Sequence, residues 1–156
     1  KHSYFGIGAA GYPEGHVENP DKDDERKRLH EKIAAGAQFI VTQFFLDNTH
    51  FLHWRDRLHK EGVSVPLVAG ILPPANWNAI SRLSEMCGVS VPKKLATALI
   101  KHKNDPEASR EIGMDHVELQ IEGLLAEGVE GVHLYALNRL ATVERLGPKL
   151  KEASGA

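Results

Sequence analysis

Apolar residues occur along the chain in short blocks that are separated by longer stretches with helical spacing. The blocks are bounded by glycine, proline or asparagine and predict strands at residues 4–10, 39–42, 65–71 and 132–137. Each block is nearly continuously apolar instead of alternating, which is typical of a parallel sheet covered on both faces. Strands alternating with helices therefore predict the α/β class.

The predicted helices begin and end at residues that cap helices. Asn19 and Pro20 predict the start of the first helix, because Asn accepts hydrogen bonds from free amides and Pro loses none at the first helical position. Gly36 predicts its left-handed end. Similar signals predict further helices at residues 49–61, 76–86 and 105–128, a short helix that begins at residue 92 and a last helix after residue 139.

Composition excludes several classes of protein. The chain has 156 residues and a net charge of −2, so it lacks the basic excess of a nucleic-acid-binding protein, and no apolar run is long enough to cross a membrane. The single cysteine, Cys87, excludes an internal disulfide and favours a reducing compartment, which we expect to be the cytoplasm. A complete (β/α)₈ barrel needs about 250 residues, so a barrel interpretation implies missing strands.

Polar residues gather where the predicted strands end. In parallel α/β proteins the ligands meet the loops at the carboxyl ends of the strands. Four clusters lie at such positions: residues 12–16, Gln43, residues 70–73 and residues 135–139. The sequence therefore predicts a binding site along this edge of the sheet.

These clusters resemble motifs of a known family. The stretches at 9–16 (AAGYPEGH), 41–45 (VTQFF), 70–73 (GILP) and 134–139 (LYALNR) are similar, in order and spacing, to strand-end motifs of methylenetetrahydrofolate reductases. The resemblance implies a (β/α)₈ TIM barrel, of which residues 1–156 form the C-terminal half with roughly strands five to eight. The family's glutamate proton donor and pterin-contacting aspartate belong to the first half, so we expect no catalytic acid here.

The resemblance also implies an activity. Family members are flavoproteins of one-carbon metabolism and methionine biosynthesis that pass a hydride from reduced FAD to 5,10-methylenetetrahydrofolate, giving 5-methyltetrahydrofolate. The implied partners are the folate substrate and NADH or NADPH as electron donor, in a homo-oligomer. Two alternatives stay open: an inactive half-barrel fragment or association module, and another flavin- or phosphate-binding barrel enzyme.

Four residues are candidates for binding the cofactor. Tyr12 and His16 match positions on the adenosine side of FAD, and both side chains can stack and form hydrogen bonds. Arg28 and Lys32 lie four residues apart on one helix face, where two cations can meet a pyrophosphate. Lys32 matches the family directly, whereas Arg28 stands where relatives often carry a neutral amide and Glu31 where they carry an arginine. The alternatives are loop residues that pack the barrel rim and a solvated charged helix face.

Two residues match substrate positions. Gln43 matches the residue that bonds the pterin ring, and Arg139 matches an arginine on the substrate side. The alternatives are a buried amide tying strand to loop for Gln43 and a structural salt bridge for Arg139. Ala79 and Leu83 depart from the family's glutamine and aromatic residue, so we expect folate contacts there either to be rebuilt, with Trp77 as the candidate, or to be weaker.

Three other patterns carry less weight. The glycines at 6–11 spell G-x-G-x-x-G, but a proline and a loop follow them in place of the required helix. His50 and His53 share a helix face without a third ligand at known zinc spacing, so we expect no metal site. Cys87 is expected to be a buried structural thiol.

Overall fold

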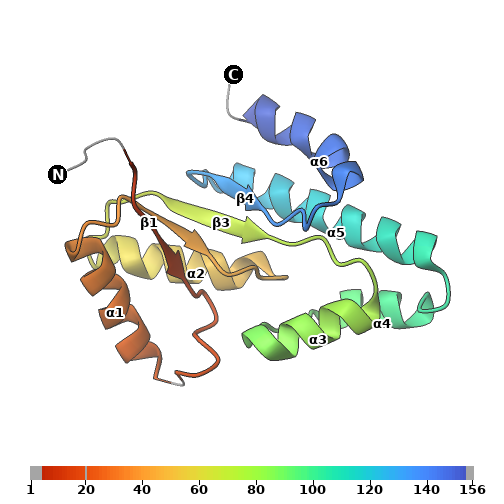
Figure 1. Ribbon diagram of the computed structural model, residues 1–156, viewed down its shortest axis with the longest axis horizontal. Helices are drawn as coiled ribbons and strands as arrows, with labels where there is room; N and C mark the ends of the chain where they lie inside the picture. Colours follow the sequence, from red (N-terminus) through yellow and green to blue (C-terminus); the bar gives the residue numbers. More distant parts are fainter. Residues whose placement is uncertain (1–4, 20, 154–156) are drawn as a thin grey trace.

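The computed structural model describes residues 5–19 and 21–153 and contains a four-stranded parallel sheet (Figure 1). The strands are β1 (Gly8–Gly11), β2 (Phe39–Thr42), β3 (Leu67–Ile71) and β4 (Val132–Leu134). Their order in the sheet, β1-β2-β3-β4, is their order in the chain. The α/β prediction is confirmed, and consecutive parallel strands form the arrangement of a barrel wall.

Helices connect and follow the strands. They are α1 (Lys22–Ala34), α2 (Asn48–Lys60), α3 (Trp77–Cys87), α4 (Lys93–Lys101), α5 (Pro106–Ala126) and α6 (Leu140–Ala153). The predicted start of α1 was wrong, because Asp21 is the N-cap and accepts from the amides of Asp23 and Asp24 at 2.9 and 3.2 Å. Asn19 instead donates to the Asp24 carboxylate at 2.9 Å, while Pro20 lies outside the described residues.

The strands at both edges of the sheet are shorter than predicted. β1 begins at Gly8, whereas the predicted block began at Tyr4, which lies outside the described residues. β4 ends at Leu134, and the chain then turns through Leu137 and Asn138, whose φ angles of 49° and 60° are incompatible with a strand. This turn points the following residues along the edge of the sheet.

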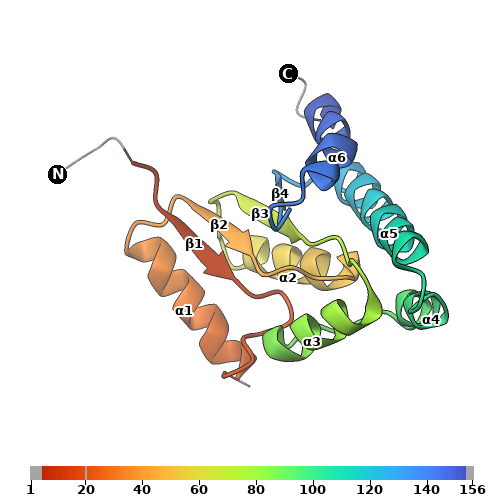
Figure 2. The same cartoon turned by 45° about the vertical axis from the view of Figure 1, so that its right-hand side comes forward.

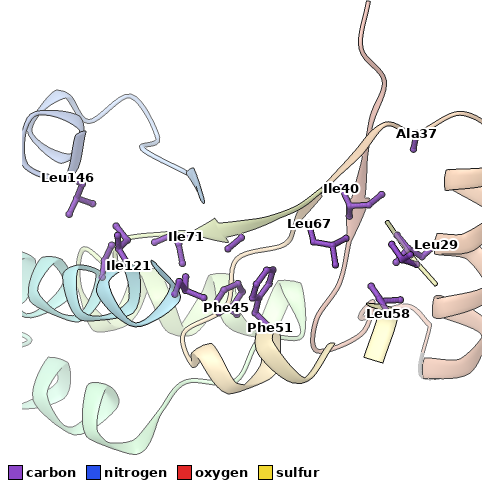
Figure 3. Packing of buried hydrophobic residues seen from close by; sticks show 14 residues of the cluster. Leu29, Ala37, Ile40, Phe45, Phe51, Leu58, Leu67, Ile71, Ile121 and Leu146 are labelled. Atoms are coloured by element: carbon purple, nitrogen blue, oxygen red, sulfur yellow. The ribbon is translucent and has the colours of Figure 1, made fainter. Parts of the chain in front are cut away.

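The main hydrophobic core lies between the sheet and the helices α1, α2 and α5 (Figures 2 and 3). Its buried side chains come from alternate positions of the strands and from one face of each helix; Ile40, Leu67, Ile71, Leu29, Phe51, Leu58, Val117, Ile121 and Leu124 are examples. Phe45 and Phe51 stack at 5.3 Å between ring centroids. Burial of this apolar surface fixes the helices on one side of the sheet.

The opposite face of the sheet is more open. Ala10 and His133 on this face are exposed, and Val41 and Val68 are half-buried. The prediction of cover on both faces is therefore met on one face only within the part of the chain that the structure describes. A barrel wall has this character, because its inner face packs against the other strands of the barrel.

A second core holds α3 and α4 beyond the carboxyl ends of β2 and β3. It contains the buried residues Phe44, Leu46, Leu72, Ile80, Val89, Leu95 and Leu99. Helix α3 ends in the left-handed region at Gly88, with a φ of 67°. This packing brings α3 beside the edge of the sheet where the ligand-type residues were predicted.

Candidate functional site

The structure places the predicted site residues at one edge of the sheet. Tyr12 follows β1, Gln43 follows β2 and Arg139 follows β4, and all the strands are parallel. The loops after the strands therefore emerge at the same edge. This edge is built from four successive strand–helix units.

The four predicted cofactor residues line a single open pocket. Tyr12, His16, Arg28 and Lys32 surround a volume of about 450 Å³ between the loop after β1 and helix α1. The Tyr12 and His16 rings meet edge to face, with centroids 4.7 Å apart. Lys32 Nζ lies 5.5 Å from the centre of the Tyr12 ring and donates to the carbonyl of Ala10 at 3.0 Å. Two aromatic rings and two cationic side chains therefore line the same pocket.

The charges around this pocket are partly matched by acids. Arg28 Nε donates to Asp24 Oδ2 at 2.9 Å, and both side chains are more than a third exposed. This pair also fits the alternative of a solvated helix face. Glu31 is exposed beside Lys27 and is not among the residues that line the pocket. Burial raises the pKa of Tyr12, with a further contribution from the charge of Glu25, so Tyr12 is a neutral phenol at neutral pH.

Glu25 also lines this pocket, a position that the sequence analysis did not predict. It is 8% exposed, lines the pocket, and its Oε1 atom is buried without a hydrogen-bond partner among the described residues. Lys32 Nζ lies 4.0 Å from it, which is too long for a hydrogen bond. Its spacing from Arg28 and Lys32, three and seven residues, is the signal that would have placed it on the same helix face.

Gln43 is half-buried at the end of β2. Its backbone amide donates to Gly11 at 2.8 Å, and its Oε1 accepts from the amide of Phe44 at 3.0 Å. The side chain is therefore oriented by its own backbone. This local bond agrees with the alternative of an amide that ties strand to loop.

Tyr135 crosses the same edge from β4. Its hydroxyl donates to the carbonyl of Thr42 at 3.0 Å, and burial raises its pKa. It passes over Gly70, where an added Cβ would lie 2.9 Å from the Tyr135 ring and 2.2 Å from the Thr42 carbonyl oxygen. Gly70, in the third strand-end motif, is thus required for close packing at the rim.

Arg139 is exposed and lies between two hollows. The smaller one, of about 20 Å³, is apolar and includes Ala79 and Leu83 of α3, the two positions that depart from the family. The larger one, of about 610 Å³, lies between the loop after β3, α5 and α6. Arg139 forms no ion pair within the described residues, so its alternative of a structural salt bridge lacks support. Trp77 packs against the second core and is not among the residues lining either hollow.

The less specific sequence patterns have structural roles. Gly8 and Gly11 lie within β1, where an added Cβ would lie 2.5 Å from the Phe39 ring and 2.8 Å from Trp54. Cys87 is half-buried, and burial raises the pKa of its thiol. Within the described ranges, no group of three or more His, Cys, Asp or Glu residues is arranged to hold a metal ion. None of the described helices is both long enough and apolar enough to span a bilayer.

The fold and this edge define a class: parallel α/β proteins with a pocket where the strands end, an arrangement consistent with part of a barrel. Within that class the chain belongs to the methylenetetrahydrofolate reductase family, whose model matches residues 1–150. The family resemblance stated from the strand-end motifs is thereby confirmed.

The curated relatives include enzymes from fungi, bacteria and plants. The chain is 37% identical to methylenetetrahydrofolate reductase 1 of Schizosaccharomyces pombe over 92% of its own length and 24% of that protein. It is 37% identical to 5,10-methylenetetrahydrofolate reductase of Pectobacterium carotovorum, over 86% of this chain and 45% of the relative. The Arabidopsis thaliana protein methylenetetrahydrofolate reductase (NADH) 1 is 34% identical over 86% of this chain and 24% of its own length. The chain thus spans less than half of these relatives.

A solved structure supports the fold. A protein from Clostridium thermocellum, described as binding two copies of 5-methyl-5,6,7,8-tetrahydrofolic acid, superposes with a TM-score of 0.57 at 18% identity. The match covers 97% of this chain and 55% of that one. At this identity the likeness is one of fold.

Proposed function

We propose that this chain is the flavin- and folate-holding part of a methylenetetrahydrofolate reductase, which converts 5,10-methylenetetrahydrofolate to 5-methyltetrahydrofolate. The observation that carries the proposal is the gathering of Tyr12, His16, Arg28 and Lys32 around one pocket. Tyr12, His16 and Lys32 match cofactor positions of the family, and Arg28 was predicted from its place on the helix face of Lys32. The names of the relatives support the same reaction.

The residues of the pocket fit a dinucleotide flavin. The Tyr12 and His16 rings offer an edge and a face to the adenosine side, and Arg28 and Lys32 offer positive charge to the pyrophosphate. The unpartnered Oε1 of Glu25 fits a hydroxyl group of the cofactor, because a buried acceptor is stabilised by a donor. When bound, FAD supplies the hydride.

The folate would lie further along the same edge. Gln43 offers an amide to the pterin ring, and the unpaired guanidinium of Arg139 offers a partner to the carboxylate of the glutamate tail. Ala79 and Leu83 form an apolar wall beside Arg139, without the glutamine and aromatic contacts of relatives. Trp77 packs against the second core instead of lining this wall, so we propose that the folate is held less tightly on this side.

The chain contributes positioning, not proton transfer. We propose that residues 1–156 form the C-terminal half of one (β/α)₈ domain, with β1 to β4 as barrel strands five to eight. The catalytic acid would then lie in the other half. Holding reacting groups in place is itself a large part of catalysis in two-substrate reactions.

Other parts of the proposal rest on the family and on composition. NADH is the favoured electron donor, because plant relatives carry NADH in their names, and NADPH is the competing donor to test. We further propose a cytoplasmic homo-oligomer that serves one-carbon metabolism. The single cysteine, Cys87, is consistent with a reducing compartment.

A flavin titration tests the proposal. The purified protein should quench FAD fluorescence saturably, and Lys32→Ala should weaken binding by about tenfold through loss of a charge-assisted contact. Lys27→Ala is the matched control, because Lys27 is on the same helix but outside the pocket. Tetrahydrofolate should then raise the melting temperature of the flavin-bound protein.

Two results would count against this function. Absence of FAD binding would favour an inert half-barrel module. Flavin binding without thermal protection by folate would favour a different flavin-dependent barrel enzyme.

A further inference from the structure

The loop that carries Tyr12 and His16 is attached to a distant part of the chain through Glu14. Glu14 Oε2 accepts from the Ser90 hydroxyl at 2.6 Å and from the Ser90 amide at 3.0 Å. His50 Nε2 lies 3.1 Å from Ser90 Oγ and 3.5 Å from Glu14 Oε2. We call Glu14, His50 and Ser90 the clasp, because they join the loop after β1, the start of α2 and the segment after α3.

Packing beside the clasp supports this junction. Both Figures 1 and 2 show the end of α3 next to the loop after β1. There, a Cβ added at Gly88 would lie 3.5 Å from Val17, so the end of α3 rests directly on the loop. The Glu14 side chain is only 11% exposed, so solvent screens its interactions weakly. Hydrogen bonds to a buried carboxylate are stronger than those between neutral groups.

The other hydrogen bonds of the loop are local. Gly15 donates to Tyr12 at 3.0 Å, Glu18 to His16 Nδ1 at 3.2 Å and Asn19 to the His16 carbonyl at 2.9 Å. Within residues 12–19, the side-chain hydrogen bonds that reach another strand–helix unit are those of the clasp. Without it, no side-chain hydrogen bond within the described residues would tie residues 12–19 to another strand–helix unit.

The clasp is not a nucleophilic triad. In such a triad the imidazole stands between the hydroxyl and the carboxylate and takes the hydroxyl proton. Here the Ser90 hydroxyl donates directly to the Glu14 carboxylate at 2.6 Å, so the hydroxyl proton does not point to His50. The geometry suits a fixed tether.

We infer that Glu14 is a positioning residue for the flavin pocket. It holds the loop that forms one side of this pocket against α3, the helix that forms the proposed apolar folate wall beside Arg139. Through Ser90 it fixes Tyr12 and His16 relative to α3, which carries Ala79 and Leu83 beside Arg139. Glu14 itself is not among the residues lining the cofactor pocket. This inference rests on the proposed function of that pocket.

Substitutions at the clasp test the inference. Glu14→Gln should weaken FAD binding by about tenfold, or about 1.4 kcal/mol, because two charge-assisted bonds become neutral. Ser90→Ala should weaken FAD binding less than Glu14→Gln does, and Ser90→Thr should bind FAD like the wild type. The double variant Glu14→Gln/Ser90→Ala should lose less FAD affinity than the sum of the two single changes. Glu85→Gln is the matched control, since Glu85 lines the hollow beside the clasp without belonging to it.

A second measurement separates the inference from the proposed function. Hydrogen exchange of the amides at residues 14–19, in the absence of flavin, should be faster in Glu14→Gln than in the wild type. If exchange and FAD affinity both stay unchanged while the melting temperature falls, Glu14 is merely structural and the inference is wrong. If the wild type binds no FAD, the proposed function fails, and the exchange result still decides whether the clasp holds the loop.

Discussion

Replacing Gly113 by alanine should separate α5 from the loop that borders the apolar wall proposed to hold folate. An added Cβ at Gly113 would lie 1.8 Å from the carbonyl oxygen of Pro74 and 2.9 Å from its carbonyl carbon. Ordinary contacts begin at 3.4 Å, so helix and loop must move apart by more than an ångström. The neighbour is backbone, so no side-chain rotation can relieve the clash.

The magnitude follows from two opposing effects. Overpacking a well-ordered interior costs about 1–3 kcal/mol, whereas alanine in place of glycine within a helix gains about 1 kcal/mol. Because the neighbour is backbone, the upper part of the overpacking range, about 2–3 kcal/mol, applies here. We therefore expect Gly113→Ala to lose about 1–2 kcal/mol, which lowers the melting temperature by about 2–8 °C in a protein of this size.

Thermal and urea unfolding followed by circular dichroism provide the assay. Gly147→Ala is the matched control, because Gly147 lies within α6 and an added Cβ would meet nothing within 4 Å. That variant should be as stable as the wild type or more stable. A Gly113→Ala protein with wild-type stability would refute the packing argument. A loss of stability should be accompanied by weaker folate binding, since Pro74 borders both hollows beside Arg139.

Three further predictions concern other contacts. Gly70→Ala should destabilise the sheet by about 1–3 kcal/mol and abolish the Tyr135–Thr42 hydrogen bond, as measured by unfolding and by tyrosine titration. Arg145→Ala should cost about 1 kcal/mol at pH 7, because Arg145 bonds Glu118 at 2.6 Å across α5 and α6. That bond lowers the pKa of Glu118 below its ordinary value of 4.5. The bond therefore stabilises the fold above pH 4.5, and this stabilisation disappears as the pH falls through the lowered pKa. The difference in urea unfolding between Arg145→Ala and the wild type should accordingly become smaller in acid. Cys87 should react with a disulfide reagent at pH 8 more slowly than a free thiol does, because burial raises its pKa.

The edge at which the ligand-type residues meet was predictable from sequence. Continuous apolar blocks such as residues 39–42 and 65–71 predict parallel strands, and parallel strands carry their following loops to one edge. Helical spacing likewise placed Arg28 and Lys32 on one face, and the structure puts both at the pocket of Tyr12. These are consequences of local periodicity, which a single sequence contains.

Long-range contacts were not predictable in the same way. Glu14 and Ser90 are 76 positions apart, and Gly113 and Pro74 meet only after α5 has packed against the loop. Glu25 lies in the acidic first turn of α1, where acids are usually exposed, and its burial at 8% exposure is visible only in the folded chain. Such contacts follow from tertiary packing, and no pattern of neighbouring residues specifies them.

Because each strand pairs only with strands next to it in the chain, the sheet can be assembled from one end to the other with short loop closures. The same simplicity leaves few contacts between units that are not neighbours, so one unit can open before the others. Glu14 and Ser90 link the first strand–helix unit to the third. This link couples the opening of the two units and makes the sheet and its helices unfold more cooperatively.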